Sequence, residues 1–520
     1  MILIGKSIAI NTYNVSYILL EHVTLNYYLV IDQGTHASRA CLFDEAGKLV
    51  NEQVKEIALR RISHSHIEQD AEEIVRSVME VVQKLIDDLN KGLKDNPSSK
   101  TSDQPVIMSS GIATQRSSVL AWKKDGTALS PVLSWQDTRG ADLLKELKQA
   151  ESEIQRLSGL PLSAHYGASK MHHLLNSAAC RDVAHDELRL SPLVSYLLFH
   201  LLDKHPYIVD HSNAQRTQLF DLHDLNWSPR LSSLFQVPVD TLPACVPVLS
   251  TKSSPHGTLQ GTTIPVTVIC GDQNAAIFGA GTISSDSALV NFGSGAFILT
   301  LLEHYRESNR LLNTIAYSEN HEALYAREGT VNGAASALDW LEDRHGTSDI
   351  WQQLPAWLDE IKQPPVFINT IGGLGSPWWN RDIDAEFITT ADGTDNDGQH
   401  SSTPDLPKQA VAVIESIVFM VCSNLETIQH EKPVSVLRVS GGLSRLDGLC
   451  QKLANLSGLK VKRVDIKETT ARGTAWLVAD RPIQWSDTTF ETFSPADAAF
   501  LKERYALFNK RLNELLNENT

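Results

Sequence analysis

Several short polar runs follow directly after apolar runs, at points where a strand would end. The first is Asp32-Gln33-Gly34-Thr35, with Arg39 shortly after it. A carboxylate there can hold a hydrated magnesium ion, Gly34 lets a phosphate approach backbone N–H groups, and Thr35 can donate to that phosphate. Arg39 can neutralise charge that develops on a phosphoryl group. The alternative is an ordinary hairpin turn, because Asp and Gly are common turn residues.

A second bend of small residues, Gly293-Ser294-Gly295, can cradle a phosphate in the same way. Alone, this bend is a weak signal. Together with the first bend, it predicts one polyphosphate held between two parts of the molecule.

Gly271-Asp272-Gln273 follows the apolar run PVTVIC, which predicts a buried strand. Reactive side chains of α/β proteins lie at the carboxyl ends of such strands. The Asp272 carboxylate could accept the proton of an alcohol while that alcohol attacks a phosphorus atom. The alternative is a helix N-cap, a position that Asp often takes.

A wall for a polyol is predicted by residues 115–117 (Gln-Arg-Ser) and 135–137 (Trp-Gln-Asp), each of which follows a short apolar run. The Arg116 guanidinium can hydrogen-bond hydroxyl groups, and the Trp135 indole can pack against C–H groups. A surface arginine and a core tryptophan are the alternative interpretation.

The hydrophobic pattern predicts the elements that position these residues. Apolar runs at 27–32 and 39–43 predict a β-hairpin whose bend carries the first polar run, and a period near 3.6 predicts a helix over about 70–90. Strands are expected at 106–113 and 265–273, with mostly helices between them from residue 140 to 240.

A second hairpin, formed by 287–293 and 297–302, opens a second half of the chain. The elements expected in this half are a helix at 408–430, strands at 436–442 and 459–464, and a helix from 468. Residues 391–408 are expected to be mobile. Two α/β halves that each open with a hairpin predict two related lobes with a cleft between them.

The composition excludes some classes of function. The 520 residues include 46 Lys and Arg against 62 Asp and Glu, a formal charge of −16. Such a balance argues against a broad nucleic-acid or anionic-membrane surface. With 42% hydrophobic residues the chain is an ordinary globular protein of about two to four domains. Six isolated cysteines favour a reducing, cytoplasmic compartment.

Residues 1–26 are apolar but interrupted by polar side chains such as Asn11 and Glu21. A membrane span needs ~18 or more nearly uninterrupted apolar residues, and a signal peptide needs a clean apolar region, so both interpretations are weak. We expect a poorly ordered extension without stable membrane insertion, and we expect that deleting residues 2–24 leaves activity intact.

Nine segments, taken in chain order, resemble the FGGY family of carbohydrate kinases. They run from about residue 27 to 480: IDQGTHASRA, GIATQRS, LSWQDTRG, HSNAQRTQLFDL, GDQNAAIFGAG, NFGSGAF, the GGLGSPWW run, VSGGLS and ETTARGTAW. DQGT followed by SR, and HSNAQRT at 211–217, look most like the glycerol kinase branch of that family.

The resemblance implies two actin/hexokinase-type (ribonuclease H-like) α/β lobes with an ATP cleft between them. The N-terminal extension covers residues 1–26, the acceptor-side lobe residues 27–281 and the nucleotide-side lobe residues 282–520. By the same resemblance Asp272 is the general base and Asp32 the magnesium ligand. The remaining residues divide into an acceptor group (Arg116, Ser117, Trp135, His165, Tyr166 and Gln273, with Asp272) and a nucleotide group (Gly34, Thr35, Arg39, Gly293, Ser294, Gly441 and Gly442).

Two departures from the glycerol kinase pattern bear on the acceptor. That branch places a Glu after the pocket Arg, where this chain has Ser117. Its pocket Tyr falls at His165 or Tyr166, and the alignment does not choose between them. Losing the Glu removes a hydroxyl acceptor and frees space, which admits a larger polyol or a ketose.

The expected activity is ATP- and Mg²⁺-dependent phosphorylation of a hydroxyl group on a small polyol or sugar. One alternative is a ketose (pentulose or heptulose) kinase of the same family. Another is a non-catalytic, actin-like nucleotide-binding regulator, which would need the phosphate bends but no acceptor pocket. The expected partner is the small-molecule substrate, with no nucleic acid; a homodimer is considered, and the sequence does not fix the assembly.

Overall fold

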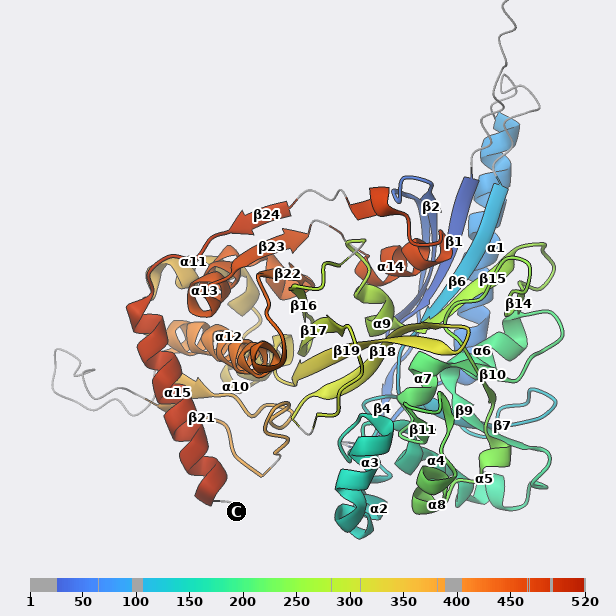
Figure 1. Cartoon of the computed structure of the whole chain (residues 1–520), viewed down its shortest axis with the longest axis horizontal. Coiled ribbons are helices and arrows are strands. Elements are labelled where there is room, and N and C mark those ends of the chain that lie inside the picture. Colours follow the sequence, from blue (N-terminus) through green and yellow to red (C-terminus); the bar gives the residue numbers. More distant parts are fainter. Residues whose placement is uncertain are drawn as a thin grey trace, which may run out of the picture.

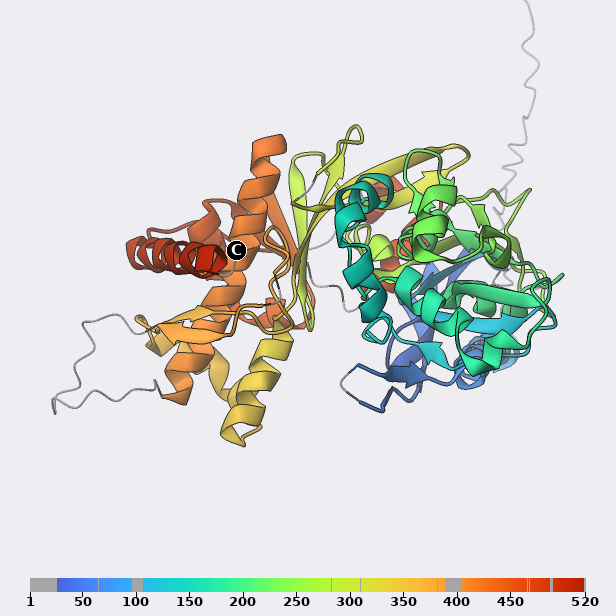
Figure 2. The same ribbon diagram turned by 90° about the horizontal axis from the view of Figure 1, so that it is seen from below.

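The computed structural model describes residues 26–63, 65–95, 106–281, 283–308, 310–380, 382–388, 405–464, 466, 468–486 and 490–518. The expected N-terminal extension therefore lies outside the described residues except for Asn26, and so does most of the segment 391–408 that was expected to be mobile. Figures 1 and 2 show two bodies side by side, one coloured mainly blue to green and the other mainly yellow to red.

The first body is built on a six-stranded sheet in the order β14-β15-β6-β1-β2-β3. Strand β1 pairs antiparallel with β2 and parallel with β6, and β6 pairs parallel with β15. The carboxyl ends of β1, β6 and β15 therefore meet at one edge of the sheet. The strands are β1 (Asn26–Gln33), β2 (Ala37–Asp44), β3 (Leu49–Glu56), β6 (Val106–Thr114), β14 (Gly257–Thr258) and β15 (Pro265–Gly271).

Helices cover both faces of this sheet. The long helix α1 (Ala71–Asp95) packs against β2 and β3, and its amphipathic sequence buries Ile74, Val78 and Leu85. On the other face, α14 (Thr469–Val478) packs against β1 and β6, although it comes from the far end of the chain. Figure 1 shows α14, in red, beside the blue strands β1 and β2.

The packing of α14 is close. A Cβ on Gly473 would lie 1.9 Å from the carbonyl oxygen of Ala275 in α9 (Asp272–Ala276), so only glycine allows this approach of the two helices. Buried Arg472 donates to the carbonyl oxygens of Gly47 and Gly279. The late segment is thus built into the first body, while the division of the chain at residue 281 stays a prediction.

The second body is built on a seven-stranded sheet in the order β18-β19-β17-β16-β22-β23-β24. Strands β16, β22 and β23 run parallel, so their carboxyl ends also meet at one edge. The strands are β16 (Ser287–Phe292), β17 (Ala296–Leu302), β18 (Leu312–Glu319), β19 (Glu322–Val331), β22 (Val436–Ser440), β23 (Lys460–Val464) and β24 (Phe490–Phe493).

Helix α12 (Leu406–Glu431) is the core helix of the second body. Within the part of the chain that the structure describes, it is the one helix long and apolar enough to cross a membrane, but 94% of its apolar window is buried inside the protein. It contacts β17, β19 and neighbouring helices. The surrounding elements are α10 (Ala335–His345), α11 (Ile350–Glu360), α13 (Asp447–Ser457), α15 (Ala499–Glu518), β20 (Val366–Ile368) and β21 (Glu386–Ile388).

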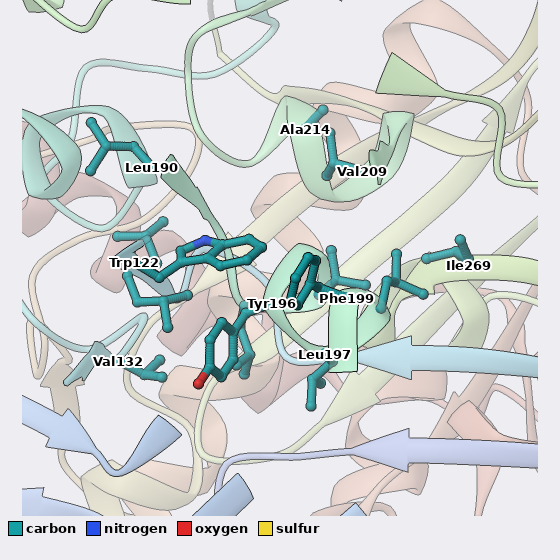
Figure 3. Close-up of a cluster of buried hydrophobic side chains, with 14 of the residues drawn as sticks. Trp122, Val132, Leu190, Tyr196, Leu197, Phe199, Val209, Ala214 and Ile269 are labelled. Carbon is teal, nitrogen blue, oxygen red and sulfur yellow. The ribbon is translucent and has the colours of Figure 1, made fainter. Parts of the chain in front are cut away.

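The rest of the first body surrounds an aromatic core. Fully buried Trp122 meets the rings of Tyr196 and Phe199 edge-on at 5.3 and 5.0 Å between centroids (Figure 3). The elements here are β4 (Arg60–Arg61), β5 (Ile67–Gln69), β7 (Val119–Lys123), β8 (Val132–Leu133), β9 (Leu188–Pro192), β10 (Ile208–Asp210), β11 (Phe220–Asp221), β12 (Asn226–Trp227), β13 (Ala244–Val246), α2 (Ala141–Glu146), α3 (Glu151–Ser158), α4 (Gly167–Leu175), α5 (Ala178–Arg181), α6 (Leu193–Leu201), α7 (His211–Gln215) and α8 (Pro229–Phe235).

Both expected hairpins are present, with Asp32 opposite Arg39 in the first and Phe292 opposite Ala296 in the second. The expected helix over 70–90 extends five residues further, to Asp95. The region 140–240, expected to be mostly helical, also contains short strands that the weak local pattern did not reveal.

Candidate active site

The carboxyl edge of the first sheet gathers the polar runs that follow β1, β6 and β15. The backbone N–H of Gln115 donates to the carbonyl oxygen of Gln33 at 2.8 Å, and the two side-chain amides join at 3.2 Å. Gly271, the last residue of β15, lies opposite Thr114 in the sheet register. The sheet therefore brings Asp32, Arg116 and Asp272 to one place, although the sequence separates them widely.

Asp272 begins helix α9, directly after β15, with Gly271 at the N-cap position. Its Oδ1 accepts the backbone N–H of Gln273 at 2.7 Å and lies 3.6 Å from Nε of Arg116. A quarter of the side chain remains exposed. Burial raises the pKa of Asp272 above its ordinary value, while the Arg116 charge opposes that change. Asp272 is thus a carboxylate of increased basicity that substrate can reach.

Asp32 is the more deeply buried of the two carboxylates, with 6% of its surface exposed. Burial, and then the charge of Asp272, raise the pKa of Asp32 to about 7, against the opposing charge of Arg39. Two such carboxylates repel each other unless a cation lies between or beside them. No group of three or more acidic, His or Cys ligands occurs in the described ranges. The donor set fits Mg²⁺, which typically takes one or two carboxylates and completes its shell with water and phosphate oxygens.

Arg116 is held by several acceptors at once. Its Nη1 donates to Oδ1 of Asn274 at 3.1 Å and lies 3.6 Å from Oε2 of Glu328, while its Nε faces Asp272. Glu328 also pairs with buried Arg216. Asn274, Arg216 and Glu328 were not among the residues expected from the sequence. The charged pair Arg327-Glu328 within strand β19 was the signal that could have revealed Glu328.

Trp135 lies between the first hairpin and the residues at 165–166. Its indole N–H donates to Oγ1 of Thr35 at 2.9 Å, and its ring meets the His165 ring edge-on at 5.5 Å between centroids. His165 meets Tyr166 at 5.2 Å. His165 is half-buried, whereas Tyr166 is buried against Leu160 and Leu312, which leaves His165 the more accessible of the two.

Thr35 has a contact that was not expected for a phosphate ligand. Its hydroxyl oxygen accepts the Trp135 indole N–H, yet the hydroxyl proton remains available for donation. Thr35 therefore links the bend of the first hairpin to the loop that carries Trp135.

Lys170 joins the two loops that carry Trp135 and His165. Its fully buried ammonium donates to the carbonyl oxygens of Ser134 and His165 at 3.0 and 2.9 Å. Burial lowers the pKa of Lys170 to about 7. One side chain thus joins the loop that carries Trp135 to the loop that carries His165.

Ser117 has an unusual backbone and environment. Its φ is 64°, in the left-handed region that non-glycine residues rarely adopt, and only 3% of its surface is exposed. Among the described residues no hydrogen-bond partner is found for its Oγ. A buried hydroxyl without a partner next to Arg116 is an available group for a substrate hydroxyl.

The second phosphate bend lies at the carboxyl edge of the second sheet. Gly293 and Ser294 are exposed after β16, and Gly441 and Gly442 are exposed after the neighbouring parallel strand β22. Gly441 has φ 88°, and a Cβ there would lie 2.4 Å from the carbonyl oxygen of Phe292, so this turn requires glycine. The two glycine turns form one open edge that a polyphosphate can approach.

A hydrogen bond joins the two edges. Nδ2 of Asn291, at the end of β16, donates to Oε1 of Gln273 at 3.2 Å.

Arg39, opposite Asp32 in the first hairpin, lies 3.7 Å from Glu52 and 3.8 Å from Glu468. Neither contact is as short as a hydrogen bond, so the Arg39 guanidinium keeps donors for a phosphate. The first hairpin therefore carries part of the nucleotide group at the same sheet edge as the acceptor group, and the Asn291–Gln273 bond joins that edge to the end of β16.

Known proteins share both the sequence and the fold. Residues 27–279 match the N-terminal domain of the FGGY family of carbohydrate kinases, and residues 288–479 match its C-terminal domain. Glycerol kinase of Acinetobacter baylyi is 30% identical over 462 residues, covering 87% of this chain and 89% of that protein. Glycerol kinase of Lactococcus lactis is 28% identical over 483 residues, covering 89% of this chain and 91% of that protein.

Solved structures agree on the two-lobed fold. A crystal structure of Plasmodium falciparum glycerol kinase with ADP superposes with a TM-score of 0.81 at 22% identity, covering 95% of this chain and 99% of that one. Gluconate kinase from Lactobacillus acidophilus superposes with a TM-score of 0.78 at 19% identity, covering 95% and 99%. The two bodies are therefore the actin/hexokinase-type lobes that the sequence predicted, and the chain belongs to the FGGY family of carbohydrate kinases.

Proposed function

We propose that the protein transfers the γ-phosphoryl group of ATP to a hydroxyl group of a small polyol or sugar, with Asp272 as the general base. The observation that carries this proposal is the position of Asp272. Its partly exposed carboxylate lies beside Arg116, at the sheet edge that faces the glycine turns after β16 and β22. Family membership makes the protein a carbohydrate kinase; the roles of individual residues are the proposal.

In this proposal the acceptor hydroxyl lies against Asp272, which takes up its proton during attack on phosphorus. Arg116 binds neighbouring hydroxyl groups, while Trp135 and His165 pack against the carbon chain. Catalysis of phosphoryl transfer rests mainly on positioning and on stabilising charge, and these fixed side chains supply both.

The nucleotide phosphates would lie along the backbone of Gly34 and Thr35 and across the turns at Gly293–Ser294 and Gly441–Gly442. Arg39 would neutralise charge on the transferred group. Asp32 would hold Mg²⁺, which supplies charge neutralisation on the phosphates when it is bound. Closure of the two lobes would exclude water and suppress ATP hydrolysis.

A ketose acceptor is the second candidate, and Ser117 is the observation that favours it. Its buried Oγ lacks a hydrogen-bond partner among the described residues, at a position where the glycerol kinase pattern has a longer carboxylate. A substrate with more hydroxyl groups than glycerol could supply the missing partner of that Oγ. The substrate would be a small molecule in the cytoplasm.

The experiment that tests the proposal is an ADP-release assay with ATP and Mg²⁺ across a panel of glycerol, larger polyols, pentuloses and heptuloses. Acceptor-dependent ADP release with any member supports the kinase, and the preferred member decides between a polyol and a ketose. ADP release that no member stimulates would favour the non-catalytic, actin-like regulator instead.

A further inference from the structure

Glu328 is a buried carboxylate beneath the acceptor side of the site, yet it comes from the nucleotide-side sheet. It belongs to β19, and 1% of its surface is exposed. Its Oε2 pairs with Nη2 of Arg216 and lies 3.6 Å from Nη1 of Arg116. One carboxylate oxygen therefore serves two arginines, both of which come from the other half of the chain.

Glu328 and Asp272 together balance the positive charges of Arg116 and Arg216. Burial alone would favour its neutral form, but the guanidiniums of Arg216 and Arg116 hold the pKa of Glu328 below its ordinary value, so it is ionised. Two buried arginines then face two carboxylates, Glu328 and Asp272. Removing the Glu328 carboxylate would leave the positive charge of a buried arginine uncompensated.

We infer that Glu328 is a positioning residue for the proposed reaction, because it holds Arg116 away from the general base. Arg116 lies between two carboxylates, with Nη1 3.6 Å from Glu328 and Nε 3.6 Å from Asp272. Without Glu328, Asp272 is the remaining carboxylate within 4 Å of Arg116 among the described contacts, and the guanidinium would move onto it. A tightly paired Asp272 would be a weaker base, and Arg116 would no longer meet the acceptor hydroxyls.

The strand that carries Glu328 also borders the nucleotide bend. Val331 of β19 pairs with Ala296, directly after the Gly293–Gly295 bend, and the backbone N–H of Ala334 donates to the carbonyl oxygen of Ser294. The acceptor arginine is therefore held from a strand whose other end supports the phosphate bend. The side chain of Glu328 itself acts on the acceptor, so its neutralisation should leave ATP binding nearly unchanged.

The chain provides a matched control for this test. Glu415 of α12 is also 1% exposed and also bridges two cations, Arg504 at 2.6 Å and Lys452 at 2.8 Å. It lies in the core of the second body, away from the acceptor side. Glu415→Gln therefore reproduces the loss of a buried, doubly paired carboxylate without touching Arg116.

The experiment compares Glu328→Gln with Glu415→Gln in the full-length protein, using the acceptor that the wild type prefers. The inference rests on the proposed function, so wild-type turnover is measured first; its absence with every acceptor contradicts the proposed function itself. With an active wild type, Glu328→Gln should lower kcat/KM for the acceptor on the order of 100-fold, with the KM for ATP within about twofold. Glu415→Gln should lower thermal stability while changing the acceptor KM and kcat by less than about twofold.

A second pair of variants keeps the inference testable if Glu328→Gln does not fold. Glu328→Asp keeps a negative charge near both arginines at a longer distance, so it should lower kcat/KM for the acceptor less than Glu328→Gln does. Glu415→Asp is its control. If the variants at 328 alter the acceptor KM and kcat no more than their partners at 415, Glu328 has only a structural role and the inference is wrong.

Discussion

The two carboxylates at the edge of the first sheet, Asp272 and Asp32, differ in what surrounds them. Asp272 lies beside Arg116, which supports its charge, and a quarter of it is exposed. Asp32 is nearly sealed, and the charge of Asp272 adds to the effect of burial in raising its pKa to about 7. This difference supports the proposal that the accessible, arginine-paired Asp272 is the base and that a cation would stabilise Asp32.

Substitution of Asp272 by Asn should abolish most turnover while leaving nucleotide binding intact. The amide keeps the size of the side chain but cannot accept the hydroxyl proton, so kcat should fall on the order of 10²–10⁴-fold. The affinity for ATP, measured by calorimetry without acceptor, should change by less than about twofold. A variant with wild-type kcat would show that Asp272 is not the base.

The dependence of kcat/KM on pH should reflect the raised pKa of Asp272. The base acts only when it is ionised, so activity should fall as the pH falls through the pKa of the folded protein. Burial raises that pKa above its ordinary value of 3.8, and the acid limb of kcat/KM should therefore lie above pH 3.8. A limb at or below that pH, in a protein shown by circular dichroism to remain folded, would contradict the environment described for Asp272.

The proposed wall for the acceptor consists of two loops rather than single residues. One carries Trp135 and the other carries His165 and Tyr166, and the buried ammonium of Lys170 bonds a carbonyl oxygen in each. The relative position of the two loops thus depends on one fully buried side chain of α4.

Replacing Lys170 with Met should loosen this wall. The variant removes both hydrogen bonds while keeping an apolar stem of similar length, so the acceptor KM should rise on the order of tenfold and the KM for ATP should not. Lys452→Met is the control, because it removes a mostly buried ammonium from the second body. Equal acceptor KM values in the two variants would mean that Lys170 contributes only stability.

Local sequence patterns predicted the two hairpin bends and the place of Asp272 after a strand, because a strand end followed by small or acidic residues is visible within a few positions. The same patterns could not predict Glu328, Arg216 or Asn274. Their positions depend on side-chain contacts between separate elements, which join residues about 40 to over 200 positions apart. Lys170 was missed for the same reason, since an isolated lysine in a helix usually faces solvent.

At the scale of the whole molecule, α14 makes the two bodies interdependent. Its residues Ala471, Ala475 and Val478 are buried in one cluster with Val30 of β1 and Val268 of β15. The family match to the N-terminal domain ends at residue 279, before this helix begins. The sequence indicated two halves, but not that the second would contribute a helix to the first, because no local pattern specifies which sheet a helix covers.

A fragment of residues 26–281 should therefore not fold as a stable unit. Without α14 the apolar face of β1, β6 and β15 is exposed, which favours aggregation and a broad thermal transition. Joining residues 468–486 to this fragment through a flexible linker should restore a sharper transition in circular dichroism. A shorter fragment that unfolds cooperatively on its own would show that α14 is dispensable.

The most direct test of the proposed reaction measures both products in one mixture. The full-length protein is incubated with ATP, Mg²⁺ and each acceptor of the panel, and mass spectrometry follows the phosphorylated acceptor while ADP is quantified. We expect one phosphorylated acceptor per ADP in the wild type, little ADP without acceptor, and neither product above background in Asp272→Asn. ADP formation without any phosphorylated acceptor, or equal product from Asp272→Asn, would contradict the proposal that Asp272 catalyses transfer to an alcohol.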